Sequence, residues 1–148
     1  MSDLSSRIAE DVKAAMRAGD KPRLSVLRML QAELKQREVV ESTELTDAVV
    51  QAVVEKMVKQ RRDAEQQFRA GQRPDLADKE ADEITVLMGY LPAQMTDDEV
   101  GALIAQAIAE TGAAGPKDMG KVMGWIKPKA QGRTDMGKLS GLIKARLS

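Results

Sequence analysis

Hydrophobic residues recur at intervals of three and four positions along almost the whole chain, with polar residues between them. Near the start, Leu4, Ile8 and Val12 follow one another at four-residue spacing, which places them on one face of a helix. The valine pairs at 49–50 and 53–54 also repeat every four residues, whereas a half-buried strand alternates apolar and polar residues every two. The pattern therefore predicts an all-α protein.

Capping residues and glycines divide the first part of the chain into about four helices. The predicted helices cover roughly residues 4–18, 21–40, 46–70 and 75–91. Asp20 and Thr46 are suitable N-caps, and Gly19 and Gly71 are suitable helix ends. The third helix is the long one, because at about 1.5 Å per residue it would measure about 39 Å.

A proline at position 92 ends this helical region, since proline pushes the preceding residue, Leu91, out of the helical conformation. Thr96 and Glu99 then form the pattern of a capping box that starts a new helix, which Gly112 ends. Two shorter helices follow at about 116–127 and 135–147, on either side of a turn that begins at Pro128. We therefore expect an N-terminal helical domain over 1–91 and a small three-helix domain over 92–148.

The two short helices share an internal repeat. Residues 118–127 recur as residues 135–144, with seven of ten positions identical at an offset of 17. Each copy carries two glycines four residues apart, although a glycine inside a helix costs about 1 kcal/mol relative to alanine. Two explanations stay open: the glycines let another helix pack closely, or they bare backbone N–H groups to a phosphate at the helix N-terminus.

Composition excludes several kinds of chemistry. The chain has no Cys and no His, so it has no disulfide, no thiolate nucleophile, no Ser-His relay and no ordinary zinc site. No Gly-rich nucleotide loop is present either. We therefore name no catalytic residue, no metal ligand and no cofactor.

Charge is divided along the chain, although 23 basic and 23 acidic residues balance overall. Residues 1–110 hold 15 basic and 21 acidic side chains, whereas residues 111–148 hold eight and two. The C-terminal end is thus the part suited to a polyanion. The basic run of the third predicted helix, from Lys56 to Arg73, is interleaved with Asp63, Glu65 and glutamines and is interpreted as a solvated helix face.

Half of the C-terminal basic residues have a structural explanation, because cations at helix C-termini offset the helix dipole. These are Lys127, Lys129, Lys144 and Arg146. The candidate RNA contacts are the other four basic residues and the repeat glycines: Lys117, Gly120, Lys121, Gly124, Arg133, Gly137, Lys138 and Gly141. Trp125 has apolar neighbours on its helix, which favours a core position over stacking on a base.

The start of the chain carries charges where a secretory signal would be apolar, and no apolar stretch approaches the roughly 20 residues that span a bilayer. These observations predict a cytoplasmic protein without a membrane partner.

Several motifs occur together along the chain: the segment 20–30, the pair of segments 59–62 and 68–71, the segment Tyr90–Gln94, and the doubled Asp-Met-Gly-Lys sequence. In this order and spacing they resemble the YqeY family. The resemblance covers nearly the whole chain. It implies an all-α protein whose C-terminal domain is related to the tail of the GatB subunit of glutamine-dependent aspartyl/glutamyl-tRNA amidotransferase.

What the resemblance implies about function is a contact with tRNA or another structured RNA through the C-terminal domain. Carbon–nitrogen ligase activity with glutamine as amido-N-donor is the activity associated with that family, but this chain resembles only the helical and tail portion, and we expect no catalysis by it alone. The alternatives are a helical protein-interaction module without nucleic acid and, least favoured, an accessory of such a ligase.

Overall fold

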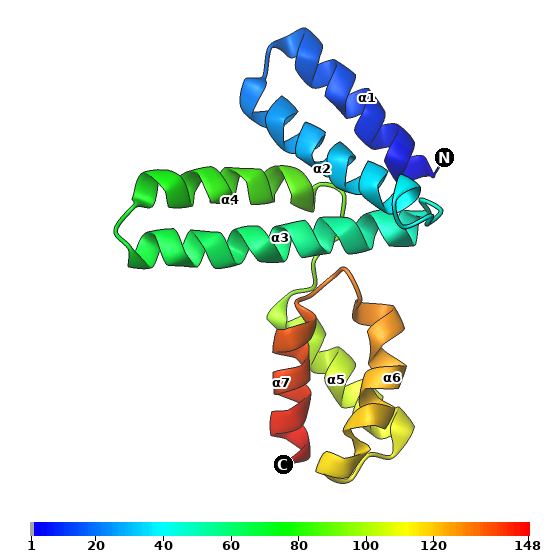
Figure 1. Ribbon diagram of the computed structural model, residues 1–148. Helices are drawn as coiled ribbons and strands as arrows, with labels where there is room; N and C mark the ends of the chain where they lie inside the picture. The colour runs from blue at the N-terminus through cyan, green and yellow to red at the C-terminus, as the bar shows by residue number, and fades with distance from the viewer. Residues whose placement is uncertain (1) are drawn as a thin grey trace. The chain divides into compact units, whose positions relative to one another are not determined.

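The computed structural model describes residues 2–148, which form seven α-helices and one short 3-10 helix (Figure 1). No strand occurs among these residues, so the all-α prediction is confirmed. The chain divides into two compact units, which we call the N-terminal unit (up to Leu91) and the C-terminal unit (Pro92–Ser148). That each unit folds by itself remains a prediction.

The N-terminal unit contains four helices: α1 (Asp3–Ala18), α2 (Lys21–Val39), α3 (Asp47–Ala70) and α4 (Pro74–Met88). The predicted caps are present, since the Asp20 and Thr46 side chains accept backbone hydrogen bonds at the starts of α2 and α3. Gly19 ends α1 in the left-handed conformation at φ 66°, which a glycine adopts without strain. In Figure 1 the helices form two hairpins, α1 with α2 and α3 with α4.

The core of this unit is built from aliphatic side chains of all four helices. Its fully buried members include Ile8, Leu27, Leu30, Val50, Val54 and Leu87. The buried positions of α3 all lie in its first half, up to Val58. Its second half packs mainly along α4, with Phe68 half-buried, so the two halves of the long helix have different neighbours.

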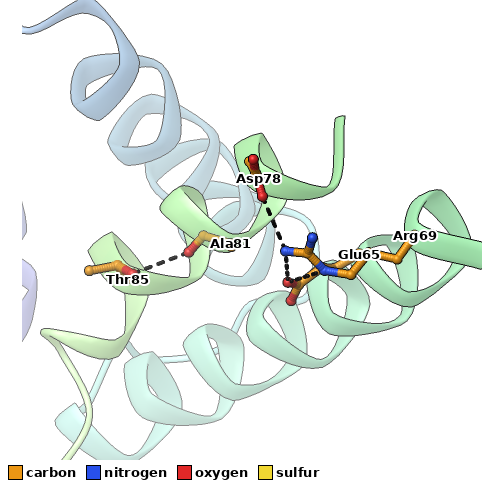
Figure 2. A network of polar contacts seen from close by, with 5 residues as sticks. All are labelled: Glu65, Arg69, Asp78, Ala81 and Thr85. Carbon is orange, nitrogen blue, oxygen red and sulfur yellow. Dashed lines mark hydrogen bonds and ion pairs between the residues drawn. The ribbon is translucent and has the colours of Figure 1, made fainter. Parts of the chain in front are cut away.

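Two arginines of α3 form ion pairs with acidic residues of α4. Arg69 Nη2 lies 2.8 Å from Glu65 Oε2 and 3.2 Å from Asp78 Oδ1 of α4 (Figure 2). Arg61 was expected on a solvated face, but its side chain is only 13% exposed and its Nε lies 3.3 Å from Glu83 Oε2. That interpretation is wrong for Arg61, because α4 covers this part of the helix.

The end of α4 is held by a cluster of polar groups on α1 and α2. Tyr90 is 2% exposed, and its hydroxyl donates a hydrogen bond of 2.5 Å to Asp11 Oδ2. Arg7 donates to the Gly89 carbonyl at 2.9 Å and lies over the Tyr90 ring, while Arg23 pairs with Asp11 at 3.9 Å. Burial, together with the hydrogen bond to the Asp11 carboxylate, raises the pKa of the Tyr90 hydroxyl.

The C-terminal unit contains α5 (Asp97–Thr111), the 3-10 helix η1 (Pro116–Asp118), α6 (Met119–Ala130) and α7 (Met136–Leu147). The predicted capping box of Thr96 and Glu99 starts α5, and Gly112 ends it at φ 67°. The core consists of buried aliphatic residues of the three helices: Val100, Ile104, Ala107, Val122, Ile126, Ala130, Leu139, Ile143 and Leu147. This cluster shares no residue with the N-terminal core.

Helix α6 extends beyond its predicted end. Pro128 was expected to begin a turn but lies inside the helix, which continues to Ala130. Proline removes one N–H, the partner of the Gly124 carbonyl one turn earlier. Gly124 lies on the exposed side of the helix, so water can reach that carbonyl and the proline is tolerated.

None of the helices in the described part of the chain combines the length and the apolar character needed to cross a membrane.

Candidate nucleic-acid interface

The repeat divides into an inner and an outer set of positions. The apolar positions Val122, Ile126, Leu139 and Ile143 are fully buried in the core of the C-terminal unit. The outer positions are exposed and carry the same residues in both helices: Gly120, Lys121, Gly124 and Lys127 in α6, and Gly137, Lys138, Gly141 and Lys144 in α7. The copies differ only at 122/139, 123/140 and 125/142. Each helix therefore presents two bare glycine positions and two lysines on its exposed side.

The glycines do not serve helix packing within this chain. A Cβ atom added at Gly120, Gly124 or Gly141 would meet nothing within 4 Å. At Gly137 it would meet only the Asp135 Oδ1 atom, at 3.2 Å. The packing hypothesis is thus wrong for contacts inside the described chain, because these glycines face away from the core.

The N-terminus of α7 is occupied by a carboxylate of the chain, and the N-terminus of α6 is continuous with the preceding 3-10 helix. Asp135 Oδ1 accepts hydrogen bonds from the N–H groups of Gly137 and Lys138, at 2.8 and 3.3 Å. Helix η1 runs into α6, and Asp118 Oδ2 accepts from the N–H groups of Ala114 and Gly115 instead. Those backbone hydrogen bonds lower the pKa of the Asp118 carboxyl. A phosphate would therefore contact the outer faces of the helices rather than their N-terminal amides.

The lysines of the outer faces are available for an external anion. Among the described residues, Lys117, Lys121, Lys127 and Lys144 have no carboxylate within 4.0 Å. Lys138 Nζ lies 3.3 Å from Asp97 Oδ1, with side-chain exposures of 60% and 90%. Such an exposed pair contributes little and can exchange partners readily.

Arg133 differs from the other candidate RNA contacts, because its side chain bonds to the backbone of the C-terminal unit. Its Nε donates to the Ala93 carbonyl at 2.9 Å, and its own carbonyl accepts from the Met95 N–H at 2.8 Å. Gln94 Nε2 donates to the neighbouring Gly132 carbonyl at 2.8 Å. Arg133 therefore ties the segment before α5 to the turn between α6 and α7.

Residues 125 and 142 occupy equivalent positions at which the two copies differ, and both side chains are large and apolar. Trp125 packs partly against the core, with Lys129 Nζ 4.0 Å from the centre of its ring. Its equivalent in the repeat, Leu142, is 41% exposed. One lysine and one apolar side chain thus lie four residues apart on each helix, Lys121 with Trp125 and Lys138 with Leu142.

Lys127 and Lys144 are functional candidates that we set aside at the level of sequence. Their positions in the last turns of α6 and α7 agree with a role against the helix dipole. However, they also end the two copies of the repeat and lie on its exposed side. The identity of the two copies at this position was the signal that could have included them.

The basic surplus belongs to part of the C-terminal unit. Over residues 92–148 the sequence has eight basic and six acidic residues, because α5 and the residues next to it contribute four acids: Asp97, Asp98, Glu99 and Glu110. The surplus is therefore confined to η1, α6, α7 and their connection. In the described part of the chain, no group of three acidic side chains is arranged to hold a metal ion.

Comparison with known proteins gives one family. The family model described as "Yqey-like protein" matches residues 5–147. Three similar proteins share the name "Altered inheritance of mitochondria protein 41, mitochondrial". The relative from Pyrenophora tritici-repentis is 31% identical over 129 residues, which cover 86% of this chain and 71% of the relative. Those from Kluyveromyces lactis and Lachancea thermotolerans are 31% and 27% identical, covering 70% and 83% of this chain and 57% and 70% of the relatives.

These relatives contradict the prediction of a cytoplasmic location, because each is named as mitochondrial. That prediction depended on the absence of an apolar secretory segment. Such an absence does not bear on mitochondrial targeting, whose segments are amphipathic rather than apolar.

Proposed function

The chain belongs to the YqeY family, and we propose that this member is an RNA-binding accessory protein whose C-terminal unit contacts RNA phosphates. The single observation that carries the proposal is the repeated outer face of α6 and α7. The exposed Gly-Lys-x-x-Gly-x-x-Lys pattern occurs twice, and it takes no part in the core.

The physical basis is the attraction between lysines and a phosphate backbone, which releases the counterions condensed on the nucleic acid. The glycines contribute because they carry no side chain, so the helix backbone beside the lysines is exposed. A backbone phosphate can therefore approach the helix closely, and the lysines can reach its oxygens. A structured RNA such as tRNA is the polyanion that the resemblance to the GatB tail implies.

Salt dependence tests this proposal. We expect the full-length protein to bind tRNA with an affinity that falls steeply as salt rises, measured by filter binding over a range of salt concentrations. Replacing Lys121 and Lys138 by Ala should lower the salt slope by up to about one unit for each lost contact. Lys127→Ala and Lys144→Ala should act in the same way, and sequence preference should change little.

Lys56→Ala is the matched control, because Lys56 is an exposed lysine on α3 of the N-terminal unit. It should leave affinity and slope unchanged. Binding that does not depend on salt, or no binding at low salt, would contradict the proposal.

A second candidate function is the docking of a partner protein helix against the same glycines. The open space beside Gly120, Gly124 and Gly141 favours it, since small residues allow helix backbones to approach closely. Such a contact should survive high salt and be blocked by Gly124→Leu. The phosphate contact should show the opposite sensitivity to salt.

A further inference from the structure

A groove of about 470 Å³ lies between α5 and α7, and Lys138 of the second repeat copy is one of its lining residues. We propose that this groove receives one unstacked nucleobase of the bound RNA, so that the RNA recognised is single-stranded or looped at this point. The inference depends on the proposed function and adds to it the class of RNA.

The floor of the groove is apolar and its opening is created by small residues. Leu142, which is 41% exposed, and the exposed Ala145 provide aliphatic surface, the buried Ile104 lies among the lining residues, and Gly101 contributes no side chain. Arg146 extends across from α7, and its Nη2 atom lies 3.4 Å from the position that a Cβ of Gly101 would take. A flat guanidinium and an aliphatic surface thus lie next to each other.

These are surfaces on which splayed bases rest. Unpaired bases in RNA complexes stack on aromatic side chains or on arginine guanidinium planes, and every base offers an apolar face. A base in continuous duplex has both faces covered by its neighbours, so a duplex cannot fill the groove. When Lys138 exchanges Asp97, 3.3 Å away, for a phosphate, the 90% exposed Asp97 carboxylate at the rim remains in water.

The groove is also in register with the phosphate contacts. Lys138 and Leu142 are four residues apart on α7, so their side chains are neighbours on the same side of the helix. A nucleotide whose phosphate meets Lys138 therefore has its base beside Leu142. Charge complementarity thus favours an RNA occupant over an apolar peptide, which would gain nothing from Lys138 and Arg146.

The test compares two RNA probes with the full-length protein in a mobility-shift titration at low salt. One probe is a 12-nucleotide oligouridylate, whose bases stack weakly, and the other is a blunt 12-base-pair RNA duplex. We expect tighter binding of the single strand. Leu142→Ala should weaken single-strand binding by about tenfold, because it removes apolar surface that the base would cover, and leave duplex binding unchanged.

A second variant, Gly101→Leu, adds a side chain to the groove, whereas Leu142→Ala removes one. Gly101→Leu should weaken single-strand binding to a similar extent while the helix content is retained, since leucine favours helix over glycine. Val40→Ala is the control: Val40 is a 73% exposed apolar residue of the N-terminal unit, and its loss should change neither affinity. Circular dichroism of each variant shows whether it is folded.

Equal affinity for the two probes, unchanged by Leu142→Ala and Gly101→Leu, would overturn the groove inference and leave the proposed function standing. Failure of both probes to bind would overturn the proposed function and the groove inference with it. If Leu142→Ala abolished binding of a helical peptide but not of the oligouridylate, the groove would belong to a protein partner, and the inference would be wrong.

Discussion

At the scale of single residues, the role of an arginine or tyrosine in this protein depends on which element covers it. Arg61 lies in a charged run that resembles a solvated face, yet α4 covers it and Glu83 pairs with it. Arg133 resembles a phosphate contact, yet it bonds to the Ala93 carbonyl. The charge of these side chains is evident from the sequence, but their partners are not. The partner of Arg61 lies 22 residues away along the chain, and that of Arg133 lies 40 residues away.

Tyr90 provides a prediction about pH. It is the only tyrosine, so tyrosinate absorbance reports this side chain alone. Because burial and the hydrogen bond to Asp11 raise its pKa, tyrosinate should not form in the folded protein near pH 10, where a free tyrosine ionises. An absorbance titration should show ionisation only at higher pH or together with unfolding.

The raised pKa of Tyr90 also affects the stability of the protein at high pH. Below about pH 10 the tyrosine is protonated in both states, whereas above it only the unfolded state ionises, so the free energy of unfolding should fall as pH rises. The loss should reach up to about 1.4 kcal/mol per pH unit. Tyr90→Phe should remove this part of the fall, at a cost of about 1 kcal/mol at neutral pH for the lost hydrogen bond. Identical pH dependence of the two proteins in urea unfolding would refute the assignment.

Arg133 provides a prediction that separates structure from RNA contact. Arg133→Ala should lower the free energy of unfolding by about 1–2 kcal/mol, because the Ala93 carbonyl loses a charged donor. Arg133→Lys keeps the charge but loses the geometry of the guanidinium, so it should lose a similar amount. Both variants should keep the salt slope of RNA binding. A lowered slope in Arg133→Ala that Arg133→Lys restores would make Arg133 a phosphate contact after all.

At the scale of elements, local signals were sufficient for most of the fold. Caps such as Thr46 and Thr96 act on amides within three residues, and glycines such as Gly19 and Gly112 end helices by their own conformation. The predicted end of α6 was wrong, because a helix tolerates Pro128 only if water reaches the Gly124 carbonyl, and the sequence does not show whether it does. The sequence also left open whether the repeat glycines face another helix or the solvent. Only the packed unit shows which side of each helix is covered.

The outer glycines give a prediction at this scale. Gly124→Ala and Gly141→Ala should each stabilise the protein by about 1 kcal/mol, because the methyl group meets nothing and alanine favours helix. Thermal unfolding followed by circular dichroism measures the effect. RNA binding should weaken in both, since the methyl group covers the exposed backbone beside the lysines. A fall in melting temperature would show that these glycines are packing positions.

At the scale of the whole molecule, the two hydrophobic cores share no residue, and each is enclosed by helices of its own unit. A domain boundary at Leu91 and Pro92 stays a prediction from the sequence, made because proline and a following capping box interrupt the helical pattern there. The compartment could not be inferred, because the charges and apolar residues of a folded chain do not record where it is delivered.

We therefore expect the segment Pro92–Ser148, 57 residues long (148 − 91), to fold when it is produced alone. Circular dichroism should show a helical spectrum and a cooperative thermal transition, of modest stability because so small a chain buries little surface. A spectrum of an unfolded chain would show that the C-terminal unit needs the rest of the protein.

The place of Trp125 allows the two units to be followed optically without any label. It is the only tryptophan, it lies in the C-terminal unit, and Lys129 covers one face of its ring, whereas the only tyrosine lies in the N-terminal unit. Indole emission excited at the red edge, where tyrosine does not absorb, therefore reports the C-terminal unit alone. Its shift to longer wavelength on unfolding can be compared with the loss of helical signal from the whole chain. Transitions that do not coincide would mean that the protein melts in two stages, each with its own free energy.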